Sequence, residues 1–90
     1  MRIRVRFLGA FADVTNSKEE MFELKTPSVN SLLDHLVERK GERFHALAFD
    51  PATRRLRGGT TLLVNGQRRG LQHELCDGDE VTLLTPIAGG

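Results

Sequence analysis

The sequence predicts an α+β fold, in which a mixed sheet of four to five strands carries one main helix on one face. Apolar residues alternate with a period of two near both ends of the chain, and they recur with helical spacing between these segments. A helix laid on one face of a sheet buries both apolar surfaces at once. With 90 residues, the chain is expected to form one domain with a single modest core.

Two strands are expected near the N-terminus. In residues 2–7 the odd positions Ile3, Val5 and Phe7 are apolar and the even positions are arginines, which is typical of a half-buried strand. Residues 20–24 form the second predicted strand, with Phe22 and Leu24 directed inward. Because these strands are close in sequence, we expect an antiparallel pair joined by a connection over residues 9–17.

The helix is predicted between Ser28 and Gly41. Ser28 is a favourable N-cap residue, and Gly41 stands where the helix would end. Arg39 and Lys40 would lie in the last turn, where positive charge favours the helix dipole. Five apolar residues share one face at helical spacing: Val29, Leu32, Leu33, Leu36 and Val37.

The second half of the chain predicts further strands. Residues 60–64 are rich in strand-forming residues and run into the turn dipeptide Asn65-Gly66. Residues 80–84 form the last predicted strand, whereas residues 43–49 fit either a short helix or irregular structure. Two strands, a helix and further strands give the β-grasp, or ubiquitin-like, arrangement. We expect residues 1–84 to form this domain, followed by a flexible C-terminal Gly-Gly tail over residues 85–90.

Composition narrows the classes of function. Hydrophobic residues make up 39% and charged residues 28% of the chain, which is ordinary for a soluble globular protein. No apolar run approaches the ~20 residues of a membrane span, so we expect no membrane partner and a cytoplasmic location. Cys76 is the one cysteine, which excludes an internal disulfide and a multi-cysteine metal site, and no metal is expected. The net charge of +1 does not favour nucleic acid as a partner.

The chain ends in Gly89-Gly90. Because glycine lacks a Cβ atom, such an end is thin and flexible, and its carboxylate can enter a narrow active site of another protein. Fully extended, residues 85–90 reach about 20 Å. Small disordered residues at a terminus are the ordinary alternative.

The turn Asp77-Gly78-Asp79-Glu80-Val81, an apolar strand, Pro86 and the final Gly-Gly resemble the end of the MoaD/ThiS family. This family contains the small subunit of molybdopterin synthase and the sulfur carrier of the thiamine pathway. Residues 4–10, 28–36 and 64–66 are similar to the family's first strand, its helix and a strand ending in Val-Asn-Gly. The resemblance spans nearly the whole chain.

The resemblance implies a carrier protein rather than an enzyme. An ATP-dependent, ubiquitin-activating-type enzyme would adenylate Gly90, and a sulfur source would convert the acyl adenylate into a thiocarboxylate. Gly89 would pass through the narrow entrance of the partner, and Pro86, Ile87 and Ala88 would form the stem of the tail. The protein would bind no cofactor, since its activating partner uses the ATP. The sulfur would go to the large subunit of molybdopterin synthase or to another sulfur-accepting enzyme.

Docking to such partners needs a surface as well as a tail. Strand alternation places Leu63 and Leu84 on the open face of the sheet. They could form a contact patch, although single exposed leucines are also common on protein surfaces. Arg4 and Arg6 could steer an acidic partner to this face. The residues expected to face the helix are Leu62, Val64, Val81 and Leu83.

Two further motifs are interpreted as structural. His73, Glu74 and Cys76 lie close in sequence, but a nucleophile also needs a positioned base and an oxyanion site. The segment 55–59, Arg-Leu-Arg-Gly-Gly, is like the tail of ubiquitin. It is internal, so its last glycine has no free carboxylate, and we interpret its glycines as turn residues.

Other functions fit the same sequence. A ubiquitin-like protein modifier would use the adenylate of Gly90 to form isopeptide bonds with target lysines. The sulfur could instead serve thiamine or cysteine synthesis or tRNA thiolation. The length of segment 43–59 favours the molybdopterin or cysteine types. A β-grasp interaction module whose tail is never activated is the third class.

Overall fold

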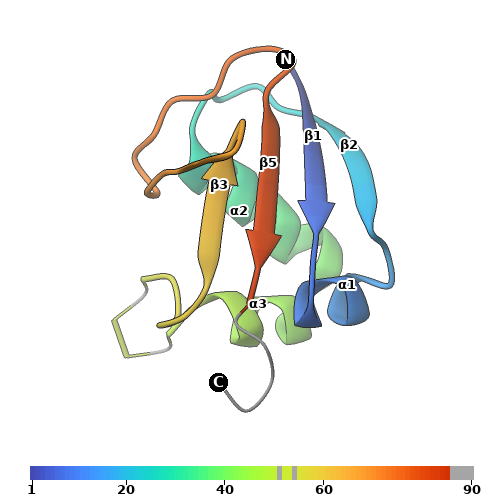
Figure 1. Cartoon of the computed structure of the whole chain (residues 1–90), viewed down its shortest axis with the longest axis vertical. Helices are drawn as coiled ribbons and strands as arrows, with labels where there is room; N and C mark the ends of the chain where they lie inside the picture. Colours follow the sequence, from blue (N-terminus) through green and yellow to red (C-terminus); the bar gives the residue numbers. More distant parts are fainter. Residues whose placement is uncertain (51, 54, 86–90) are drawn as a thin grey trace.

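The structure is a computed structural model that describes residues 1–50, 52–53 and 55–85. Five strands form one mixed sheet in the order β2-β1-β5-β3-β4 (Figure 1). The sheet and its helices confirm the predicted α+β, β-grasp class. The strands are β1 Arg2–Phe7, β2 Glu19–Glu23, β3 Thr61–Val64, β4 Gln67–Arg68 and β5 Glu80–Leu84. The helices are α1 Ala10–Thr15, α2 Val29–Lys40 and α3 Glu42–Ala48.

The two terminal strands of the fold lie side by side at its centre. β1 and β5 run parallel, with Val5 beside Val81 and Phe7 beside Leu83, and all four side chains are fully buried. β2 pairs with the other edge of β1 and β3 with the other edge of β5, both antiparallel. The chain therefore begins and ends its sheet in the best-protected strands.

Helix α2 covers one face of this sheet. Val29, Leu32, Leu33 and Leu36 are fully buried, as their spacing predicts. The hydroxyl oxygen of Ser28 accepts a hydrogen bond of 3.1 Å from the backbone N–H of Ser31, which confirms the predicted N-cap.

The connection expected over residues 9–17 contains a helix that the sequence analysis missed. Helix α1 is six residues long and buries only Phe11 and Thr15, which is too little for a clear periodic pattern. The ring of Phe11 packs against Phe44 of α3, with 5.6 Å between the ring centroids. The long-range contact between these rings therefore stabilises two short helices at one end of the sheet.

The segment 55–59 folds back onto α3. Leu56 forms a bridge with Phe49, and the backbone N–H of Arg57 donates to the carbonyl of Ala48 at 2.7 Å. Gly59 has a φ of +90°, and the N–H of Thr60 closes the turn on the carbonyl of Arg57 at 2.9 Å. These contacts confirm that the internal Gly-Gly is a turn.

Candidate functional site at the exit of β5

Strand β5 ends at Leu84, and Thr85 is the last residue that the structure describes. The hydroxyl oxygen of Thr85 accepts a hydrogen bond of 3.2 Å from the backbone N–H of Ala10, at the start of α1. The N–H of Leu8 donates to the carbonyl of Leu83 at 2.9 Å. These bonds fix the point and the direction in which the chain leaves the sheet. The predicted tail residues lie outside the described part: Pro86, Ile87, Ala88, Gly89 and Gly90.

Gly9 allows the chain to pass closely beside this exit. Its φ is +61°, a conformation that residues with a side chain rarely adopt. A Cβ atom at Gly9 would lie 2.9 Å from the hydroxyl oxygen of Thr85. A glycine is therefore required here both by the backbone conformation and by the close approach. The sequence placed Gly9 at the start of a connection and within the family resemblance, but it did not predict this contact, because the contact joins residues far apart in the chain.

The open face of the sheet carries three leucines near the exit. Leu63 and Leu84 are half-buried, whereas Leu62, Val64, Val81 and Leu83 are buried against the helix, as alternation predicts. Leu8 directly follows the buried Phe7 and is 39% exposed. Because Phe7 pairs with Leu83, Leu8 lies beside Leu84 on the open face. We call Leu8, Leu63 and Leu84 the open-face patch. Sequence reasoning missed Leu8, although the alternation of β1 could have identified it.

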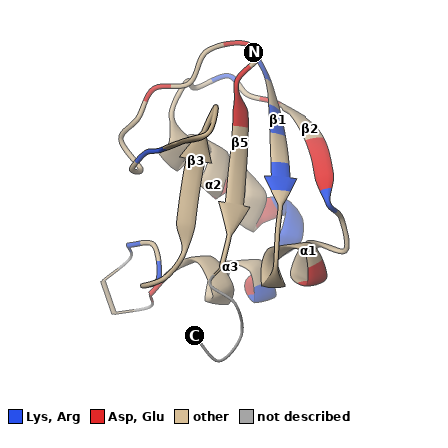
Figure 2. Cartoon of the chain, in the orientation of Figure 1, with Lys and Arg blue, Asp and Glu red and all other residues tan. Residues whose placement is uncertain are grey.

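Arginines border the open-face patch. Guanidinium nitrogens of Arg4 and Arg6 lie 3.9 and 3.8 Å from the carboxylate of Glu80. Figure 2 shows this basic stretch of β1 beside the acidic start of β5. Such exposed ion pairs contribute little stability, so both arginines can exchange partners at small cost.

Cys76 lies away from the exit of β5. Cys76 is exposed in the turn before β5, at the opposite end of that strand from the exit. The described hydrogen bonds include none between its thiol and His73. Over residues 1–50, 52–53 and 55–85, no cluster of side chains has the composition of a metal site. None of the helices in this part combines the length and apolar character needed to cross a membrane.

Solved structures share this fold over nearly their whole length. SAMP1 from Haloferax volcanii superimposes with a TM-score of 0.85 at 24% identity, covering 100% of both chains. A putative molybdopterin converting factor subunit 1 from Pyrococcus furiosus has a TM-score of 0.77 at 24% identity, covering 97% of this chain and 99% of its own. In the BexX/CysO complex of Amycolatopsis orientalis, one chain gives a TM-score of 0.73 at 24% identity, covering 98% and 99%. At these identities the likeness shows the fold. No curated protein matches the sequence significantly.

The parallel β1–β5 pair, the single covering helix and the exit of β5 define a ubiquitin-like β-grasp protein. The model of the ThiS family matches residues 5–90, a range that includes the terminal Gly-Gly. The chain therefore belongs to the ThiS family, the ubiquitin-like sulfur carriers and modifiers. Proteins of this kind are generally non-catalytic, and they work with adenylating enzymes and sulfur-accepting partners.

Proposed function

We propose that this protein carries sulfur as a thiocarboxylate on Gly90 and delivers it in molybdopterin synthesis. The observation that supports this most is the family match, which extends over the tail to residue 90. A second support is the exit of β5, where Thr85 is bonded to Ala10 and the chain leaves from the centre of the sheet. A tail that starts from a fixed point keeps its last carbonyl carbon within a limited distance of the docking surface.

The chemistry takes two steps on Gly90. The carboxylate attacks the α-phosphorus of ATP in the activating enzyme, forms a C–O–P linkage and releases pyrophosphate. Hydrosulfide, or a sulfur donor equivalent to it, then attacks the carbonyl carbon, and AMP leaves with the electron pair of the C–O bond. The adenylate is needed because the oxygen of a free carboxylate is a very poor leaving group. The chain itself supplies the acyl group, and its partners supply catalysis and ATP.

The open-face patch and Arg6 are the proposed docking surface for these partners. Leu8, Leu63 and Leu84 are partly exposed apolar side chains near the point where the tail begins. Leu84 directly precedes Thr85, and Leu8 and Leu63 lie on the two sides of β5, after β1 and on β3. Burying them would anchor the domain while the tail enters the active site. Arg6 is 47% exposed and borders the patch, so an acidic rim on the partner would complement it.

Intact-mass measurement of the protein purified from its native cells tests the carrier function. The expected species gains the mass difference between one sulfur and one oxygen atom, and tandem fragmentation places this gain on Gly90. Alkylation of the thiocarboxylate with iodoacetamide should add one further group to the same residue. An unmodified C-terminus under all growth conditions that need the molybdenum cofactor would contradict the proposal.

The same experiment addresses the second candidate, a protein modifier. The adenylate of Gly90 serves either fate, because a lysine amine can attack the same carbonyl carbon. Peptides that carry Gly-Gly derived from residues 89–90 on lysines of other proteins would support conjugation. Their absence together with the sulfur-containing species would support the carrier alone.

Charge insertion into the open-face patch tests docking. Leu63→Asp and Leu84→Asp are each expected to lower the rate of activation by the cognate enzyme about fivefold to thirtyfold, since buried interface anchors contribute about 1–2 kcal/mol. Leu71→Asp, at a partly buried loop position away from the exit, is the matched control. Unchanged activation of both patch variants, with the fold intact by circular dichroism, would exclude this surface.

A further inference from the structure

The outer edge of β2 has backbone groups that pair with no other described strand. β2 is the last strand on its side of the sheet and pairs only with β1 among the described strands. The backbones of Met1 and Leu24 exchange hydrogen bonds of 2.8 and 3.3 Å, and Phe7 donates to Lys18 at 2.9 Å. In an antiparallel pair, bonded and non-bonded residues alternate. The N–H and C=O groups of Met21 and Glu23 therefore point away from β1, toward the outside of the sheet.

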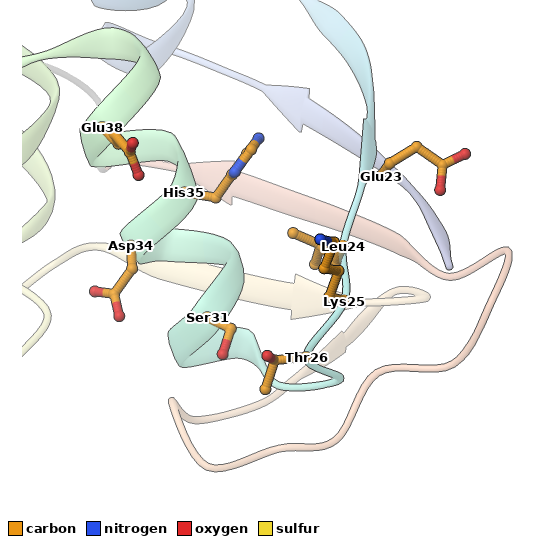
Figure 3. Close-up of a pocket in the computed structure, with 8 residues that line it drawn as sticks. All are labelled: Glu23, Leu24, Lys25, Thr26, Ser31, Asp34, His35 and Glu38. Atoms are coloured by element: carbon orange, nitrogen blue, oxygen red, sulfur yellow. The ribbon is translucent and has the colours of Figure 1, made fainter.

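An open pocket of about 370 Å³ lies beside this edge (Figure 3). Its walls come from the end of β2 and the following residues on one side, and from α2 on the other. The imidazole of His35 projects from α2 toward β2, where it meets the ring of Phe22 edge-on with 5.5 Å between the centroids. At the other end of β2, Lys40 bonds to Glu20 at 2.6 Å and ties α2 to the strand. The pocket thus forms a groove between the end of β2 and α2, and Thr26 and Ser31 also line it.

Carboxylates lie on both sides of the edge, together with some cations: Glu23 pairs with Arg2 and with the N-terminal ammonium group, and Lys25 also lines the pocket. On the open face, Glu19 and Glu23 flank Met21, which is 52% exposed and the most exposed large apolar side chain of the described residues. On the helix side, the exposed carboxylates of Asp34 and Glu38 line the pocket. An incoming strand would place alternate side chains on these two faces, so carboxylates would meet it on each.

We propose that the β2 edge and its groove bind an extended, basic peptide segment of a partner protein, which adds to the sheet as a sixth strand. The backbone of Met21 and Glu23 would supply the hydrogen bonds, and the flanking carboxylates would select lysine and arginine side chains. This site lies across β1 from β5, so it is separate from the exit and the open-face patch. The inference does not depend on the proposed function.

A second copy of this chain fits the edge less well than a basic segment. If two β2 strands paired antiparallel around Met21, Glu19 of one would face Glu23 of the other, twice. Like charges directly opposite one another destabilise a strand pair. Acidic residues on an edge strand thus prevent self-association while leaving the edge available to a strand of opposite charge.

Titration of isotope-labelled protein with a short alternating Lys-Val peptide, followed by NMR, tests the proposal. The expected result is a saturable change of the amide shifts of Met21, Glu23 and His35. An alternating Glu-Val peptide should bind about tenfold more weakly or not at all, because its glutamates lie on one face of the added strand and would meet carboxylates there. A Lys-Val peptide that is N-methylated at every residue should lose binding, because neither of its edges can donate hydrogen bonds to β2.

Matched charge reversals separate the groove from general electrostatics. Glu38→Lys in α2 is expected to weaken binding of the Lys-Val peptide about threefold to tenfold, whereas Asp13→Lys, an exposed reversal in α1 that does not line the pocket, should change it less than twofold. Absence of binding, full binding of the N-methylated peptide, or shift changes confined to the open-face patch would each overturn the proposal. A concentration-dependent dimer with shifts at β2 would assign the edge to a second copy and also overturn it.

Discussion

The two ends of strand β5 are held by different kinds of contact. At its start, Asp77 accepts from the backbone N–H of Arg2 at 2.7 Å, and Asp79 accepts from the N–H of Cys76 at 2.8 Å. Asp79 also accepts from the side chain of Asn65 at 2.9 Å, and Asn65 in turn accepts from the N–H of Glu80 at 3.0 Å.

At the exit, the chain is held by the hydrogen bond from the backbone N–H of Ala10 to the hydroxyl oxygen of Thr85 and by the close approach of Gly9.

This difference indicates separate roles for two parts of the sequence that carry the family resemblance, the Asp-Gly-Asp-Glu turn before β5 and Gly9 beside its exit. The Asp-Gly-Asp-Glu turn is structural, since its two aspartates and Asn65 connect β1, β3 and β5 at the end opposite the tail. Where β5 passes α1, the side chains are small, because Gly9 has none and that of Thr85 is short. This arrangement fits the proposed presentation of the tail to partner enzymes.

The largest expected effect is on the rate of adenylation, and it comes from changing the length of the tail beyond the exit. Deletion of Gly90 moves the reacting carboxylate back by about 3.5 Å, and a misplacement of about 1 Å can already cost a hundredfold in rate. We therefore expect adenylation to fall below about a hundredth of the native rate, while the midpoint of thermal unfolding stays unchanged. A pyrophosphate-exchange assay measures the rate. One residue added after Gly90 should act likewise, and Cys76→Ser is the control that leaves the rate intact. Native rates in both tail variants would break the assignment of the exit.

Asp79→Ala should give the largest loss of stability. The substitution removes the hydrogen bonds that the Asp79 carboxylate accepts from Cys76 and Asn65. We expect the free energy of unfolding to fall by about 2 kcal/mol, because each such bond contributes about 1 kcal/mol. Urea denaturation measures this change, with Glu74→Ala in the same loop as the control. Activation per folded molecule should remain native. A stability equal to that of the control would show that the start of β5 is not held by this aspartate.

Gly9→Ala should affect both stability and activation. The left-handed φ and the contact at 2.9 Å with Thr85 predict a loss of about 1–2 kcal/mol. Because Thr85 must shift, the rate of adenylation should also fall. Gly70→Ala is the matched control, since a Cβ atom there meets nothing within 4 Å. Equal stability of the two variants would show that the exit does not require a glycine at position 9.

Thr85→Val should give the smallest change. The side chain keeps its shape but can no longer accept from Ala10, which predicts a loss of about 0.5–1 kcal/mol. Hydrogen exchange of the Ala10 amide should accelerate, and Thr85→Ser should preserve the native rate of exchange. Unchanged exchange in the valine variant would show that this bond does not hold the exit.

Much of the fold could be predicted because its signals are local. The alternation in β1, the helical stripe and caps of α2, and the Asn65-Gly66 turn each lie within a few consecutive residues. Helix α1 could not be predicted, because Phe11 becomes a core residue through distant parts of the chain, among them Phe44 of α3. The sequence did not identify Leu8 as part of the site, because it predicts that the first strand ends at Phe7. The tail over residues 86–90 stays a prediction.

The sequence alone determined the β-grasp class, the inward faces of the strands and the Gly-Gly end, because periodicity and turn chemistry depend on neighbouring residues. Only the tertiary structure decided which distant residues meet. It brought Gly9 against Thr85, Asp79 against Asn65, and α2 alongside the free edge of β2. Such contacts depend on strand order and register, which arise when the whole sheet closes on its helix, and no local pattern of residues encodes them.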